Sequence, residues 1–93
     1  MHGEYKVPGG KLVVADFAVE AGALRRVRVS GDFFLYPEEA LAAIDGALEG
    51  APIADDEAAL AARIVAALAP EVTMLGFSPE AVARAVRRGL GDA

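Results

Sequence analysis

The chain has 93 residues, a formal net charge of −5 and no cysteine. Its length fits one domain spanning residues 1–93, and the lack of cysteine excludes a disulfide framework, thiolate metal sites and a cysteine nucleophile. The acidic balance argues against nucleic-acid binding, and neither a membrane-length apolar run nor a signal-peptide pattern is present, so we expect a cytoplasmic protein.

The first third of the chain has the alternation of β-strands. Residues 11–19 alternate apolar side chains between two faces, and Gly22 supplies a turn before a second alternating segment at residues 24–30. A second small-residue turn precedes residues 33–35, which are aromatic enough for a third strand. These patterns predict a three-stranded antiparallel meander.

Three amphipathic helices are predicted after the strands. The first is expected to begin at Pro37, with two carboxylates in its first turn, and to stop at Gly50. The second follows an acidic cap at residues 55–57, and the third follows Ser78. The predicted fold class is therefore α+β with two layers, a three-stranded antiparallel meander followed by three helices that cover one face of the sheet.

A proline- and glycine-rich segment before the first predicted strand is one candidate site, formed by Lys6, Pro8, Gly9, Gly10 and Lys11. Backbone amides at paired glycines, with a lysine beside them, can bind an anion such as phosphate. The P-loop spacing is missing, and a strand rather than a helix follows. The alternative interpretation is a simple turn that starts the strand, and both interpretations stay open at this point.

The second candidate site is the turn formed by Ser30, Gly31, Asp32, Phe33 and Phe34. Adjacent aromatic residues on a strand point to opposite faces, so one phenylalanine should leave the core. A partner surface, a helix on the second face or a partly exposed ring can each account for it. Asp32 is expected to brace the turn rather than to act as a base.

Other charged groups have structural explanations. Alternation is expected to split the arginines of residues 25–28 between two faces, leaving a solvated strand. The acidic groups at residues 38–39 and 55–57 fit helix capping better than metal binding, and His2 is expected to lie at a mobile terminus. With no nucleophile–base pair and no ligand cluster, we predict no catalytic residue, no metal site and no enzymatic activity of the chain alone.

Taken in order, these motifs resemble the C-terminal accessory domain of lipoate–protein ligase A. The matching segments are residues 6–12, 30–34, 37–41 and 76–80. The resemblance covers nearly the whole chain. The sequence is similar to the form of this domain that is encoded as a separate protein. It implies a fold of the SufE/NifU type.

The resemblance also implies a function. It points to an accessory subunit, in a heterodimer with a catalytic ligase subunit, that supports ATP-dependent activation of lipoate to lipoyl-AMP before transfer to a lysine of an acceptor domain. ATP, magnesium and lipoate are then expected in the complex, and no cofactor on this chain alone. Both turns, from Lys6 to Lys11 and from Ser30 to Phe33, are expected at the partner interface or near the nucleotide. Two alternatives are an adaptor of the same fold with no ligase role and a small enzyme acting through the glycine-rich turn.

Overall fold

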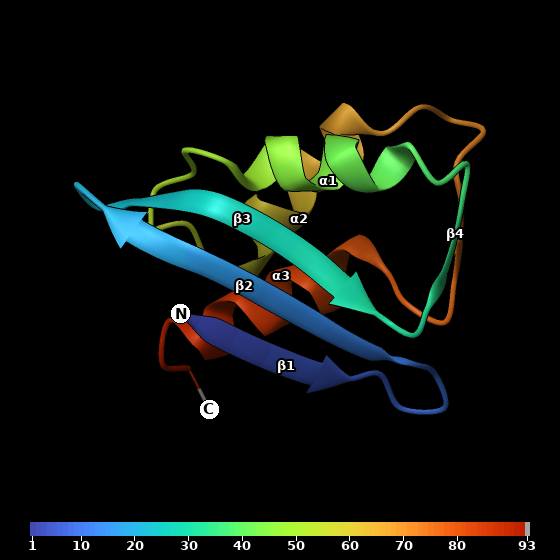
Figure 1. The fold of residues 1–93 in the computed structure, drawn as a ribbon, viewed down its shortest axis with the longest axis horizontal. Helices are drawn as coiled ribbons and strands as arrows, with labels where there is room; N and C mark the ends of the chain where they lie inside the picture. Colours follow the sequence, from blue (N-terminus) through green and yellow to red (C-terminus); the bar gives the residue numbers. More distant parts are fainter. Residues whose placement is uncertain (93) are drawn as a thin grey trace.

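The structure, a computed structural model, describes residues 1–92. Its elements in chain order are β1 (His2–Lys6), β2 (Leu12–Glu20), β3 (Ala23–Gly31), β4 (Phe34–Tyr36), α1 (Ala40–Leu48), α2 (Glu57–Ala67), β5 (Thr73–Leu75) and α3 (Pro79–Gly89) (Figure 1). The predicted α+β class, with a three-stranded antiparallel sheet and three helices, is confirmed. No helix within residues 1–92 is long and apolar enough to cross a membrane.

The composition of the main sheet differs from the prediction. The β2–β3 hairpin is present, with positive φ angles at Ala21 and Gly22 in its turn. The third strand of this sheet is β1, which pairs with β2, whereas β4 pairs with β5 in a separate two-stranded ribbon. The expectation that residues 33–35 would complete the meander was wrong, because these residues pair with a strand about 40 positions later in the chain.

The N-terminal segment is also more ordered than predicted. His2 lies opposite Asp16 in the β1–β2 register, and its ring nitrogens lie 2.5 Å from the Asp16 carboxylate and 2.7 Å from that of Glu4. The expectation of a mobile terminus at His2 was wrong, because backbone pairing and these side-chain contacts hold the strand in place.

A bulge in β3 changes which side chains face the solvent. Arg26 has a positive φ of 53°, and the β2–β3 register shifts beside it. Leu24 and Val27 are therefore both buried although three positions separate them, and the arginines between them are both exposed. The expected division of the arginines in residues 25–28 between two faces was wrong, and all of them lie in solvent.

The outer edge of β3 is covered by carboxylates from α1 and its end. Glu49 accepts hydrogen bonds from the backbone N–H groups of Val27 and Arg26, both at 3.1 Å, and Asp45 accepts one from Val29 at 2.9 Å. The bond from Val27 is the main reason why the pKa of Glu49 lies below its usual range. These contacts satisfy edge amides that would otherwise be free to pair with another strand.

The helix starts are partly as predicted. The side chains of Asp56 and Ser78 cap α2 and α3, accepting from backbone N–H groups at 2.8 Å and 3.1 Å. The first helix, however, begins at Ala40 rather than at Pro37. The Ala40 N–H donates to the Pro37 carbonyl in a preceding turn, so the two glutamates predicted for the first helical turn lie before the helix.

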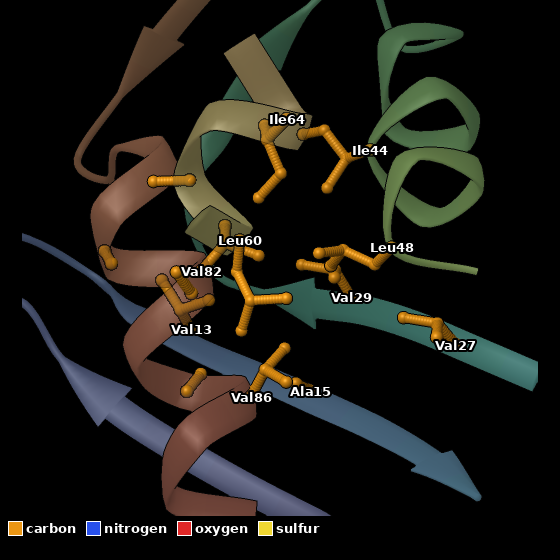
Figure 2. Packing of buried hydrophobic residues seen from close by; sticks show 14 of the residues in the cluster. Val13, Ala15, Val27, Val29, Ile44, Leu48, Leu60, Ile64, Val82 and Val86 are labelled. Carbon is orange, nitrogen blue, oxygen red and sulfur yellow. The ribbon is translucent and has the colours of Figure 1, made fainter. Parts of the chain in front are cut away.

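The core lies between one face of the sheet and the three helices. α3 packs across β1 and β2, α1 packs against β3, and α2 contacts both of these helices. Figure 2 shows valines of the sheet meeting leucine and isoleucine side chains of α1 and α2. The largest fully buried side chains are Leu24, Ile44, Leu48, Leu60, Ile64, Val13, Val82 and Val86.

Candidate functional site

The two turns singled out from the sequence lie together at one end of the main sheet. The β1–β2 hairpin turn and the end of β3 both reach this end, beside β4 (Figure 1). A third segment, residues 76–77, joins them there through backbone and aromatic contacts. We call residues 6–11, 30–33 and 76–77 the turn cluster.

The first turn of the cluster is built by its proline and glycines. The Gly10 N–H donates to the Val7 carbonyl at 2.8 Å, and Gly9 has a φ of 70°. Proline followed by a residue with positive φ is the pattern of a type II turn, which explains why glycine suits the second of these positions. The Lys6 ammonium donates to the Gly10 carbonyl at 2.6 Å and braces the turn from the strand side.

The amide groups of this turn are largely hydrogen-bonded within the protein. Besides the Gly10 bond, the Lys11 N–H donates to the Gly76 carbonyl at 2.9 Å. An anion nest needs free, convergent amides, so the turn interpretation is favoured over the nest. The Lys11 side chain is exposed and has no hydrogen-bond or ion-pair partner within residues 1–92, so it is the group here that can still meet an anion.

The second turn is held against the start of β2. Asp32 accepts a hydrogen bond from the Leu12 N–H at 2.9 Å, which confirms its expected bracing role. Gly31 has a φ of 153°, and a Cβ atom there would lie 2.2 Å from the Leu12 carbonyl oxygen. Any other residue at Gly31 would push the two strands apart, so the turn depends on glycine.

The third segment was not predicted as part of the site. Phe77 stacks on Phe33, with ring centroids 3.8 Å apart and planes inclined by 18°. Gly76 lets the chain pass close to Lys11, because a Cβ at this position would lie 2.5 Å from the Lys11 Cγ. Both residues belong to the segment 76–80, which resembles the family. Their position beside the two turns, however, depends on the long-range pairing of β5 with β4.

Next to the turn cluster, the β4–β5 ribbon carries an exposed apolar face. Phe34 lies opposite Leu75 and Tyr36 lies opposite Thr73. Phe34, Tyr36 and Leu75 are 53%, 63% and 56% exposed, whereas Leu35 on the other side is buried. The expectation that one of the paired phenylalanines leaves the core is confirmed, and it is Phe34. We call Phe34, Tyr36, Thr73 and Leu75 the ribbon face.

A groove of about 460 Å³ lies beside the ribbon face, between the end of β3 and the start of α1. Its lining includes Ser30, Phe33, Phe34, Glu38 and Leu41. The groove therefore joins the second turn of the cluster to the ribbon, and its lining combines apolar side chains with the carboxylate of Glu38.

The chemistry of this surface suits contact with another molecule. It presents the exposed ammonium group of Lys11, which has no partner within residues 1–92, together with an apolar face and a groove. Within residues 1–92, no group of three His, Cys, Asp or Glu side chains is arranged to hold a metal ion. Such a surface can position a charge or bind a protein, and both require a partner.

Comparison with known proteins gives one informative match. No family profile and no curated protein sequence matches this chain. A solved chain with a similar fold belongs to a structure described as an archaeal lipoylation system, a bipartite lipoate protein ligase and its E2 lipoyl domain from Thermoplasma acidophilum. The TM-score is 0.64, the sequence identity is 20%, and the match covers 100% of both chains. The likeness shows a shared fold along the whole chain and agrees with the resemblance found in the motifs.

Proposed function

We propose that this chain is a non-catalytic accessory subunit of a lipoate–protein ligase. It forms a heterodimer with a catalytic subunit and supports the ATP-dependent activation of lipoate to lipoyl-AMP, which precedes transfer to a lysine of an acceptor domain. Two observations support the proposal: the full-length fold likeness to a chain from a bipartite lipoate protein ligase system, and the meeting of both motif turns at one end of the sheet. The first observation carries the proposal, because it points to lipoylation, and the second supplies a surface on which a partner could act.

The proposed mechanism uses the turn cluster. Its two turns face the catalytic subunit and order the loop that holds the nucleotide, with Lys11 near the phosphates. Because Lys11 is exposed and has no hydrogen-bond or ion-pair partner in residues 1–92, its charge is available to stabilise the charge that develops on the phosphates. ATP, magnesium and lipoate bind in the complex, the chain alone holds none of them, and the pair works in the cytoplasm.

The proposal is tested by lipoate-dependent ATP–pyrophosphate exchange, which isolates activation from transfer. The cognate catalytic subunit is assayed with and without this chain. We expect exchange only when both are present. Exchange that is the same without the chain would contradict the accessory role and favour an adaptor of the same fold.

The role of Lys11 is tested by Lys11→Ala. The variant should slow lipoyl-AMP formation on the order of tenfold, because a charge positioned at the phosphates is lost, while transfer from preformed lipoyl-AMP changes little. Lys11→Arg keeps the charge and should restore most of the activation rate. Equal effects of Lys11→Ala on the two half-reactions would remove the phosphate role and leave the accessory role in place.

A further inference from the structure

We propose that the catalytic subunit docks on the ribbon face, through an apolar surface of its own that is bordered by basic side chains. This inference rests on the proposed function and deepens it, because it assigns the partner to one surface and states the chemistry of that partner. The turn cluster then lies beside the docking surface rather than at its centre.

The apolar side chains of the ribbon face form a continuous patch. Phe34 and Leu75 are direct cross-strand neighbours, and Tyr36 follows Phe34 on the same side of β4. Other large apolar residues that are exposed lie elsewhere in the chain, such as Ile53 in the connection between α1 and α2 and Val65 on α2. Scattered apolar residues are normal on a protein surface, whereas a contiguous aromatic and aliphatic patch is typical of an interface.

The ribbon holds this patch in a fixed position. Its inner side chains, Leu35 and Met74, pack against the core, and the stacked rings of Phe33 and Phe77 fix the chain on both sides of it. The Lys11 N–H also donates to Gly76 directly after β5. A surface that is already ordered before binding loses little conformational entropy on association.

The charges around the patch determine which partner fits. Most carboxylates of the chain have a hydrogen-bond or ion-pair partner. Within residues 1–92, the carboxylates without one are Glu38, Glu39, Glu71 and Glu80.

Three of these free carboxylates lie at one end of the ribbon face. Glu38 and Glu39 border a depression formed with Phe34 and Tyr36, and Glu71 lies two residues before β5 at the same end of the ribbon. An apolar patch bordered by free carboxylates is complementary to an apolar patch bordered by Lys or Arg. The same charges would repel a second copy of this acidic chain or a nucleic acid.

The groove beside the ribbon adds shape to this surface. Its lining includes Phe33, Phe34, Leu41 and Glu38. An apolar side chain of the partner, ending next to a basic group, would fill the groove and pair with Glu38. Docking there would also bring the partner close to Lys11, because Lys11 contacts the residue that follows Leu75.

The proposal is tested with the full chain and the cognate catalytic subunit by isothermal titration calorimetry. Phe34→Ser and Leu75→Ser should each raise the Kd about tenfold or more, because each removes an apolar contact from the interface. Val65→Ser on α2 is the matched control, since Val65 is 57% exposed and Leu75 is 56% exposed. The control should change the Kd less than about twofold. Urea midpoints of all variants verify that each is folded.

The basic character of the partner is tested by the double variant Glu38→Gln and Glu39→Gln. It should weaken binding at low salt more than at high salt and reduce the salt dependence of the Kd. An unchanged salt dependence would contradict the charge complementarity.

The outcomes separate this inference from the function on which it rests. A wild-type chain that neither binds nor stimulates the catalytic subunit overturns both. A wild-type chain that stimulates exchange, with ribbon variants that bind as tightly, overturns the docking surface alone. The docking surface is also overturned if the chain forms a dimer that Leu75→Ser dissociates while binding to the catalytic subunit is unchanged.

Discussion

The helix-covered sheet and the β4–β5 ribbon use apolar residues in opposite ways. On the sheet, Val13 and Ala15 are fully buried, and α3 approaches β1 so closely that only a glycine fits at position 3. On the ribbon, Phe34, Tyr36 and Leu75 are more than half exposed. The sheet and its helices therefore supply the stability of the fold, and the ribbon presents a surface.

The acidic side chains also differ between the sheet and the ribbon. Acidic groups next to the sheet are used for structure, as Asp45 and Glu49 are on the edge of β3. Those next to the ribbon, such as Glu38 and Glu71, have no partner within residues 1–92. Apolar exposure and free charge occur at the same end, and the proposed docking surface rests on this difference.

The difference between the two regions is tested most strongly by substituting one leucine in each of them. Leu60 is 1% exposed and Leu75 is 56% exposed. Leu60→Ala should lower the free energy of unfolding by about 3–4 kcal/mol, because it leaves a cavity in the core, whereas Leu75→Ala should change it by less than about 0.5 kcal/mol. Urea denaturation measures both. Similar losses for the two variants would contradict the division into a stabilising region and a presenting region.

A second pair of variants tests the close contact between β1 and α3. A Cβ at Gly3 would lie 1.9 Å from the Ala85 carbonyl oxygen, whereas one at Gly46 on α1 meets nothing within 4 Å. Gly3→Ala should therefore cost about 2–3 kcal/mol of stability, because the strand must move away from the helix. Gly46→Ala should gain about 0.5–1 kcal/mol through helix propensity. A Gly3→Ala protein as stable as the wild type would show that β1 is not packed on α3.

Local patterns were sufficient to predict much of the fold. The hairpin, the caps at Asp56 and Ser78 and the helical periods could all be predicted, because each depends on neighbours within a few residues. The pairing of β4 with β5 could not, because strand partners far apart in sequence leave no local signal. The addition of β1 was missed for another reason, because its short and mostly polar segment lacks the apolar alternation of a strand. The bulge at Arg26 was missed because a single extra residue shifts the alternation without a glycine to mark it.

The candidate site, like the fold, could be predicted only in part from the sequence. The turns around Pro8 and Gly31 stand out through their small residues, and the strand order brings them to one end of the sheet. The free amides that an anion nest requires were not confirmed in the first turn. The N–H groups of Gly10 and Lys11 donate hydrogen bonds to carbonyls of the same chain, and these bonds are visible only in the structure. The stacking of Phe77 on the second turn depends on β5, which is too short for its pattern to be distinguished from a loop.

The smallest predicted effect concerns His2, on the exposed side of the sheet. The Glu4 carboxylate, and next that of Asp16, raise the pKa of His2 above its ordinary value of 6.5 by hydrogen bonding to the ring. A raised pKa in the folded state means that this contribution to stability is complete below pH 6.5 and is lost as the pH rises through the folded value. The urea midpoint should therefore fall slightly from pH 6 towards pH 9, and His2→Gln should remove that part of the slope. Because the ring is exposed, the effect is small and decreases with salt. An identical slope in His2→Gln would show that other groups cause it.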